Sequence, residues 1–478
     1  MRSVAKKVGS VKYISTRGRA PTLAFEEILL AGLADDGGLY VPAAWPRLSK
    51  AELEALRGAS YAEVAFRVIR PFVGDAVGAD DLRAILDDSC RAFGPAGVAP
   101  LRKLGSNEWL LELFHGPTLA FKDVALQLLG RLFNHVLKRR GERITVIGAT
   151  SGDTGSAAIA ACQDQDAIEV FILHPKGRVS EVQRRQMTTV ASPNVHNIAI
   201  EGTFDDCQAL VKAMFGDEAF RRRHRLSAVN SINWARIMAQ SVYYVAAGLA
   251  LGAPGRRVAF AVPTGNFGNV FAGYAAREMG LGIEQLIIGS NRNDILTRFF
   301  ESGTMQTGPV FATLSPSMDI QVSSNFERLL FELYDRDGAK LADVMDRFRT
   351  GGRFSIDSER LRRVRALFDA ARFDDDATKA TIKTVYEESG ILVDPHTAVG
   401  VAAGRAKRRD AATPLVAIAT AHPAKFPDAI AAATGVRPPL PESLATLLQR
   451  PERCATLAND LQAVKDFVAK GVAGRKAA

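Results

Sequence analysis

A lysine at position 122 is the first residue whose surroundings suggest chemistry. Lys122 follows the aromatic residue Phe121 and stands just before an apolar segment, residues 124–133, which is expected to be helical. Burial there would disfavour the ammonium form and leave a free amine, which is able to form a Schiff base or act as a general base. The alternative is a surface lysine near a helix start, because lysine is seldom buried.

Three segments of the chain share one plan, in which an apolar run typical of a buried strand is followed by a polar, glycine-containing loop and then a helix. The strands are expected at residues 144–147, 170–173 and 258–262, and the loops at 150–155, 174–180 and 263–269. Glycine lets the backbone approach an anion closely, and the N–H groups at a helix start favour negative charge. Residues 265–268 are therefore the best candidate for a phosphate cradle, with a purely steric tight turn as the alternative.

The other two loops offer different polar groups. The loop at 150–155 has hydroxyl as well as N–H groups, which suits a carboxylate or a phosphate, although one of its polar residues could instead cap the following helix. In the next loop, Lys176 and Arg178 precede Ser180, whose spacing to Gln183 is that of a capping box. We therefore expect Ser180 to cap a helix and the two cations to provide a second phosphate site.

The order of these elements predicts an α/β fold. In doubly wound sheets the loops after the strands line one crevice, so we expect the three loops to meet, together with a fourth loop after a strand at 415–419. The first hundred residues have the pattern of a separate helical lobe. We predict an N-terminal lobe at 1–100, a smaller α/β domain with Lys122 at 101–240, and a larger α/β domain with the 265–268 loop at 241–478.

Composition excludes several classes of function. The 478 residues include 61 Lys and Arg against 52 Asp and Glu, and this excess is spread along the chain, so it does not indicate nucleic-acid binding. The basic run at 221–225 is interpreted as a solvated face. Four scattered cysteines without a CxxC pair indicate neither a disulfide framework nor a zinc site, and they fit a reducing, cytoplasmic setting. No segment approaches the roughly 20 apolar residues of a membrane span.

Several common catalytic motifs are missing from the sequence. The seven histidines show no metal-binding spacing, so no metal is predicted, and His115, His396 and His422 are expected to be structural or orienting groups. The sequence contains no GxGxxG, GxxxxGK[ST] or GxSxG motif, which argues against dinucleotide-binding, P-loop and serine-hydrolase functions.

Residues 114–123, which end in Phe-Lys-Asp, together with Pro-Thr-Gly-Asn-Phe-Gly at 263–268, closely resemble the threonine synthase family of fold type II pyridoxal-phosphate enzymes. Further blocks with this resemblance lie at residues 13–18, 36–42, 148–155, 230–240, 315–330 and 420–426. Because these blocks occur in order through nearly the whole chain, the similarity is specific. It implies pyridoxal 5'-phosphate as cofactor and a fold type II architecture, with two doubly wound parallel-sheet domains and the N-terminal helical lobe.

The resemblance also implies roles for individual residues. Lys122 would form the Schiff base with the cofactor, and Thr420 would contact its pyridine nitrogen. The cofactor phosphate would be bound by Gly265, Asn266, Phe267 and Gly268. The α-carboxylate of the substrate would be held by Thr150, Ser151, Gly152, Asp153 and Thr154. The candidates for the substrate phosphate are Lys176, Arg178, Ser180, Asn233 and Arg236.

The activity implied is that of a carbon–oxygen lyase acting on phosphate, the last step of threonine biosynthesis. O-phospho-L-homoserine and water would give L-threonine and phosphate by γ-elimination and β-addition of water. The expected partner is this small-molecule substrate, with no nucleic acid and no membrane, and the expected state is a monomer or homodimer. Two alternatives stay open: another fold type II lyase such as a serine or threonine dehydratase, which needs no second phosphate pocket, and a non-catalytic homologue that binds pyridoxal phosphate.

Overall fold

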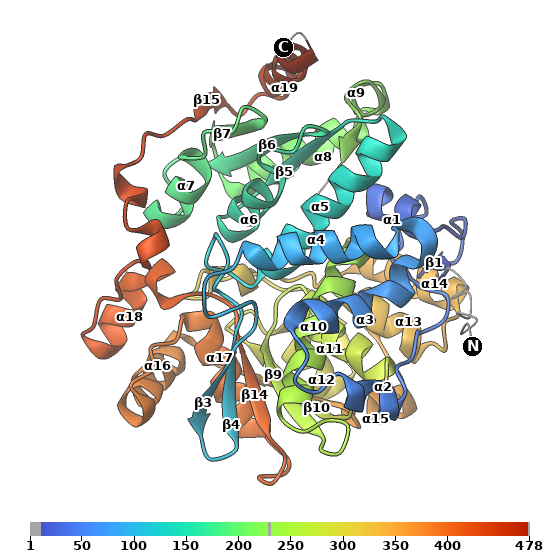
Figure 1. Ribbon diagram of the computed structural model, residues 1–478, viewed down its shortest axis with the longest axis vertical. Coiled ribbons are helices and arrows are strands. Elements are labelled where there is room, and N and C mark those ends of the chain that lie inside the picture. The colour runs from blue at the N-terminus through green and yellow to red at the C-terminus, as the bar shows by residue number, and fades with distance from the viewer. Residues whose placement is uncertain (1–10, 228–230, 477–478) are drawn as a thin grey trace.

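The larger of two parallel sheets lies in the lower half of the computed structural model, which describes residues 11–227 and 231–476 (Figure 1). Its strand order is β13-β10-β9-β14-β4-β3, and every strand is parallel to its neighbours except β3, which is antiparallel to β4. The strands are β13 (Phe368–Arg372), β10 (Ile283–Ser290), β9 (Val258–Pro263), β14 (Leu415–Ala419), β4 (Glu108–Glu112) and β3 (Leu101–Gly105). The central strands are apolar and fully buried, as is typical of parallel sheets covered by helices on both faces.

The smaller sheet lies in the upper half of Figure 1 and is parallel throughout, in the order β15-β7-β6-β5-β8. Its strands are β15 (Ala455–Ala458), β7 (Val195–Glu201), β6 (Ile168–Pro175), β5 (Ile144–Ala149) and β8 (Leu226–Ser227). The helices of this half are α5 (Lys122–Arg140), α6 (Asp153–Cys162), α7 (Glu181–Thr188), α8 (Phe204–Gly216), α9 (Glu218–His224) and α19 (Leu461–Lys476). The predicted α/β class with parallel sheets is confirmed.

Helices cover the larger sheet as well. The helix α17 (Pro395–Lys407) packs on β9, β10, β13 and β14, whereas α11 (Gly268–Glu278) and α12 (Ile295–Ser302) pack on β10 and its neighbours. The remaining helices of this half are α13 (Phe326–Leu333), α14 (Gly338–Gly351), α15 (Ser358–Arg365), α16 (Asp375–Ser389) and α18 (Pro427–Thr434). Short elements complete it: the strand pair β11 (Thr304–Gln306) and β12 (Arg353–Ser355), and the 3-10 turns η2 (Pro316–Met318) and η3 (Pro423–Lys425). The turns η4 (Glu442–Leu444) and η5 (Leu447–Gln449) follow, and η5 packs on α7 of the other half.

The N-terminal part packs between these halves. It contains the strand pair β1 (Tyr13–Ser15) and β2 (Tyr40–Pro42), the helices α1 (Phe25–Ala31), α2 (Lys50–Ala55), α3 (Tyr61–Val73) and α4 (Ala79–Arg91), and the turn η1 (Gly74–Ala76). The Tyr13 hydroxyl donates to the Phe72 carbonyl at 2.8 Å, and both rings pack on Trp234. Trp234 begins α10 (Trp234–Ala250), so this part is fastened to the helix that carries Arg236.

The sheets cross the predicted domain boundaries in two places. Strands β3 and β4 lie within the predicted 101–240 region but belong to the larger sheet, and β15 lies within 241–478 but belongs to the smaller one. Local sequence patterns identify a strand but not its distant partner, and sequential strands often do not pair. Among the described residues, no helix is long and apolar enough to span a membrane.

Candidate active site

Lys122 is the first residue of α5, and the end of β14 holds the turn that precedes it. The Phe121 N–H donates to the Thr420 carbonyl at 2.8 Å, and the His422 N–H donates to the Leu119 carbonyl at 3.0 Å. Thr420 is therefore next to Lys122 although the two are far apart in the sequence. The Lys122 residue is 8% exposed. The surface-lysine alternative is wrong for this position.

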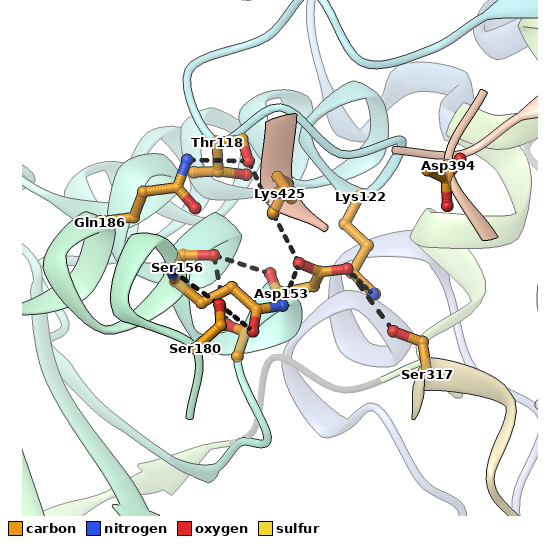
Figure 2. A network of polar contacts seen from close by, with 12 residues as sticks. Thr118, Lys122, Asp153, Ser156, Ser180, Gln186, Ser317, Asp394 and Lys425 are labelled. Carbon is orange, nitrogen blue, oxygen red and sulfur yellow. Dashed lines mark hydrogen bonds and ion pairs between the residues drawn. The ribbon is translucent and has the colours of Figure 1, made fainter. Parts of the chain in front are cut away.

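Asp153 bridges two lysines beneath this turn (Figure 2). Its Oδ2 lies 3.3 Å from the Lys122 Nζ, and its Oδ1 lies 2.5 Å from the Lys425 Nζ. The Gln183 Nε2 donates to the same Oδ1 at 2.8 Å. Burial acts to raise the pKa of the Asp153 carboxyl, but Lys425 and Lys122 together hold it well below its ordinary value. Asp153 is thus an ionised acceptor at the centre of the site.

Charge around Lys122 is unbalanced. Arg236 is 4% exposed, and its Nη1 has no hydrogen-bond partner among the described residues. Burial lowers the pKa of Arg236 to about 10. Burial is also the main cause that lowers the pKa of Lys122; Asp153 opposes it, and the cations Lys425 and Arg236 add to it. Two buried carboxyl groups, Asp153 and Asp123, lie near these three buried cations, and Asp123 is hydrogen-bonded to Thr118. The Arg236 Nη1 keeps no described partner, which fits an anionic ligand.

The loop after β9 has the form of an anion cradle. The Gly265 carbonyl accepts from the Ser323 hydroxyl at 2.7 Å, and the Asn266 carbonyl accepts from the Asn325 N–H at 3.1 Å. No described residue accepts a hydrogen bond from the backbone N–H of Gly265, Asn266 or Phe267. These donors stand at the start of the eleven-residue helix α11, where the dipole favours an anion. The residues present thus fit the phosphate of the predicted cofactor.

Side chains around this loop explain its composition. A Cβ at Gly265 would lie 3.1 Å from the Ser317 carbonyl oxygen, so the turn η2 packs tightly against the loop. Phe267 has a left-handed φ of 63° and is the N-cap residue of α11, while the centre of its buried ring lies 4.9 Å from that of Phe326. The Gly265 position thus requires a small residue, and Phe267 contributes its ring to the core and its backbone to the loop.

The loop at 150–155 is held largely by its own residues. The Thr150 hydroxyl oxygen accepts from the N–H groups of Gly152 and Gly155 at 2.9 and 2.8 Å. Gly152 has φ 143°, and a Cβ there would lie 2.5 Å from the Gln183 side chain. The N-cap residue of α6 is Gly152, with no side-chain cap, so the alternative that Ser151, Asp153 or Thr154 caps the helix is wrong. Ser151 is exposed and Thr154 is half-buried.

The residues predicted to bind the substrate phosphate lie partly at the surface and partly in the buried site. Ser180 caps α7 as predicted, and its hydroxyl donates to Gln183 Oε1 at 2.9 Å, which links it through Gln183 to Asp153. Lys176 and Arg178 are exposed, and the Lys176 Nζ pairs with Glu201 at 3.1 Å. These two cations thus lie at the surface beyond β6, whereas Arg236 is buried near Lys122.

Asn233 is predicted to bind the substrate phosphate, but both polar atoms of its side chain are hydrogen-bonded within the protein. Its Oδ1 accepts from the Ala235 N–H at 3.0 Å and caps α10, while its Nδ2 donates to the Leu29 carbonyl at 2.9 Å. The amide is fully buried and joins α10 to the N-terminal part, so Asn233 has a structural role here. The sequence block at 230–240 begins with Asn230, which lies outside the described residues.

Sequence reasoning assigned no part in binding or catalysis to four residues that the structure brings to the site. Lys425 and Gln183 bind Asp153 directly, and Ser317 Oγ lies 3.5 Å from Asp153 Oδ2. His396 accepts a hydrogen bond from the Ser317 N–H at 3.2 Å. The one sequence signal for Lys425 is its place in the block at 420–426 that resembles the threonine synthase family. Gln183 was recognised only as the capping-box partner of Ser180.

Comparisons with known proteins agree with this geometry. A family model described as pyridoxal-phosphate dependent enzyme matches residues 94–347, and models of the threonine synthase N terminus and C-terminal region match 12–90 and 397–468. The threonine synthase of Pseudomonas aeruginosa is 57% identical over 461 residues, which cover 96% of this chain and 98% of the relative. The solved structure of PLP-bound threonine synthase from Brucella melitensis has a TM-score of 0.95 and 54% identity, and the match covers 97% of this chain and 100% of that one. The yeast threonine synthase structure has a TM-score of 0.92 and 40% identity, with 97% and 99% coverage.

Proposed function

Since this chain belongs to the threonine synthase family of pyridoxal-phosphate-dependent enzymes, we propose that it converts O-phospho-L-homoserine and water to L-threonine and phosphate. The enzyme is a pyridoxal-phosphate-dependent lyase of fold type II. The main alternative, a dehydratase acting on serine or threonine, would handle a substrate without a phosphate group. What separates the two is therefore the number of anions that the site must hold.

The unbalanced charge around Lys122 is the observation that supports a phosphorylated substrate. Lys122, Lys425 and Arg236 are buried together; Asp153 pairs with both lysines and Asp123 is hydrogen-bonded to Thr118, so no described carboxylate pairs with Arg236. The loop at 265–268 adds a separate set of backbone donors for the cofactor phosphate. A second phosphate, on the substrate, would then balance Arg236, whose Nη1 is buried without a described partner. A buried guanidinium without a partner is costly, and a dianion would offset that cost.

When bound, pyridoxal phosphate supplies an electron sink for the carbon from which a proton is removed. In this proposal Lys122 holds the cofactor through its amine, residues 265–268 hold its phosphate, and Thr420 contacts its ring nitrogen. The loop of Thr150, Ser151, Gly152, Asp153 and Thr154 binds the substrate carboxylate through its N–H and hydroxyl groups.

Lys122 would also act as the base. The lowered pKa of its amine makes the neutral form available, so Nζ is able to take the α proton of the substrate. Asp153 Oδ2, 3.3 Å away, then pairs with the ammonium that forms. Arg236 would bind the substrate phosphate and stabilise it as it leaves. Lys176, Arg178 and Ser180 lie at the neighbouring loop after β6 and are the further candidates for this phosphate.

The decisive experiment supplies purified enzyme and pyridoxal phosphate with O-phospho-L-homoserine in ¹⁸O-labelled water, followed by mass spectrometry. The proposal predicts threonine with one labelled hydroxyl oxygen, together with one phosphate per threonine. Simple hydrolysis of the ester would give homoserine instead. Keto-acid release from threonine, without threonine formation from phosphohomoserine, would support the dehydratase alternative and contradict the proposal.

The enzyme would work in the cytoplasm, in keeping with its scattered cysteines, and it would be a monomer or a homodimer. The chain would divide into the N-terminal lobe at 1–100 and α/β domains at 101–240 and 241–478, with β3 and β4 exchanged into the larger sheet and β15 into the smaller one. Light scattering of the purified protein measures the oligomeric state directly.

A further inference from the structure

Lys425 is a fully buried lysine that sequence reasoning left without a role. It ends the short turn η3, and its side chain is 0% exposed. Its Nζ lies 2.5 Å from Asp153 Oδ1 and donates to the Thr118 carbonyl at 2.8 Å. Figure 2 shows these contacts on the opposite side of the Asp153 carboxylate from Lys122. One carboxylate is thus shared between a lysine that reacts, in the proposed function, and a lysine that does not.

We propose that Lys425 is a positioning residue: a fixed cation that holds the Asp153 carboxylate in place while Lys122 gains and loses its own charge. The inference rests on the proposed function, because Lys122 changes charge only if its amine reacts. Whenever that amine is neutral or bonded, Asp153 would otherwise be a buried carboxylate without a cationic partner, which is strongly destabilising. Lys425 prevents this, and Gln183 adds a neutral hydrogen bond to the same oxygen.

The contacts of Lys425 suit a fixed rather than a reacting cation. Thr118, whose carbonyl it binds, belongs to the turn before Lys122, and the Thr118 hydroxyl is in turn hydrogen-bonded to Asp123 at 2.7 Å. The Lys425 ammonium therefore joins η3, the turn before α5 and the start of α6. A lysine side chain that is bound on two sides and has no solvent contact has little freedom to swing toward a ligand.

Lys425 also affects the Lys122 amine through its charge. The groups that act on Lys122 are Asp153 from α6, Lys425 from η3 and Arg236 from α10, with the Phe121 ring 5.4 Å from its Nζ. The buried Asp123, next to Lys122 on α5, lies near enough to Lys425 to feel its charge. With Lys425 neutral, Asp153 would pair with Lys122 alone and favour its ammonium. Lys425 therefore keeps more of Lys122 in the amine form at a given pH.

The test measures how fast the apoenzyme captures pyridoxal phosphate covalently, by absorbance, as a function of pH. The pH midpoint of this rate reports the titration of Lys122. Lys425→Gln keeps hydrogen-bonding capacity but removes the charge, so we expect its midpoint to rise by about one pH unit. Lys425→Arg keeps the charge, so its midpoint should stay near that of the unmodified enzyme. Lys465→Met, which removes the 2.6 Å ion pair with Asp217 on the outer helices, is the matched control and should leave the midpoint unchanged.

If Lys425→Gln fails to fold, a second pair of variants tests the role of Lys425. Asp153→Asn and the double variant Asp153→Asn/Lys425→Gln differ only at residue 425, which is charged in the first and neutral in the second, and the double variant leaves neither partner of the buried pair charged. The double variant should have the higher midpoint. Equal midpoints in this pair, or an unshifted Lys425→Gln that still takes up the cofactor, would overturn the inference. An unmodified enzyme that captures no pyridoxal phosphate or makes no threonine would instead overturn the proposed function.

Discussion

The backbone N–H of Ser317 donates a hydrogen bond to Nε2 of His396 at 3.2 Å. The other ring nitrogen, Nδ1, lies 2.8 Å from Asp394 Oδ1. A nitrogen that accepts a hydrogen bond carries no proton, so the ring is neutral and its Nδ1–H points to Asp394. The His396 ring thereby fastens the turn η2 to α17. Because η2 packs against Gly265, this relationship supports the loop that would hold the cofactor phosphate.

Replacing His396 should therefore weaken cofactor binding without removing the reactive amine. His396→Leu deletes the acceptor for Ser317 and leaves Asp394 with one fewer donor, a loss of about 1–3 kcal/mol. We expect the Kd for pyridoxal phosphate, measured by fluorescence titration, to rise by roughly tenfold or more. His135→Leu serves as control, since His135 is about 20 Å along α5 from Lys122. An unchanged Kd in His396→Leu would show that the turn holds its place without the ring.

Removing the amine of Lys122 should abolish both covalent cofactor binding and activity. Lys122→Ala is expected to lose the visible absorbance band of the bound cofactor and to lower threonine formation by more than about a thousandfold, as removal of a residue central to covalent catalysis does. Folding should survive, because Asp153 retains Lys425 as a partner. Lys138→Ala, an exposed lysine on the same helix, is the control. A purified Lys122→Ala protein that keeps the band and the turnover would refute the assignment.

Arg236 and Lys176 should contribute unequally to substrate binding. Arg236 is buried, whereas the Lys176 side chain is 53% exposed and already paired with Glu201. Attraction at exposed positions is weakened by solvent and salt, so Arg236→Met should raise the KM for O-phospho-L-homoserine far more than Lys176→Met. Steady-state kinetics at low and high salt would measure both effects. Equal KM values for Arg236→Met and the unmodified enzyme would mean that the substrate phosphate binds elsewhere.

Much of the fold was predictable because its signals are local. The strand expected at 415–419 is β14 with the same bounds, and those expected at 144–147 and 258–262 form the main part of β5 and β9. Their apolar, β-branched residues and the loops after them identify parallel strands without knowledge of any partner. The membership of β15 in the smaller sheet was not predictable in this way, since it depends on pairing Ala455 with Ile198 across the chain.

The residues of the site likewise fall into those that local sequence patterns predict and those that they do not. The Ser180 cap followed from a spacing of three residues, and the structure confirms it. Burial of Lys122 was an open question in the sequence because a lysine at a helix start is compatible with either environment. Lys425 was beyond local reasoning, since its carbonyl partner Thr118 is 307 residues away. Electrostatic partners that meet only through tertiary packing leave no periodic pattern in the sequence.

Asp123 should make the stability of the protein fall as pH rises through weakly acidic values. This carboxyl is fully buried, and burial raises its pKa from 3.8 to about 6, although two hydrogen bonds from Thr118 partly oppose the rise. The folded state thus holds the proton more tightly than the unfolded state. The associated stability is complete below about pH 4 and is lost as pH rises through about 6, a change of about 3 kcal/mol at most.

Asp123→Asn removes this titration, because an amide stays neutral and can still accept from the Thr118 N–H and donate to its hydroxyl. Relative to the unmodified protein, the variant should gain stability steadily from pH 4 to pH 6 and level off above pH 7. Urea unfolding midpoints of the two proteins, taken at each pH without cofactor, measure the difference. Asp35→Asn, at an exposed aspartate, controls for the lost acidic residue. A difference that stays constant across this range would mean that the Asp123 carboxyl is already ionised at pH 4, held in that form by Thr118 and Lys425.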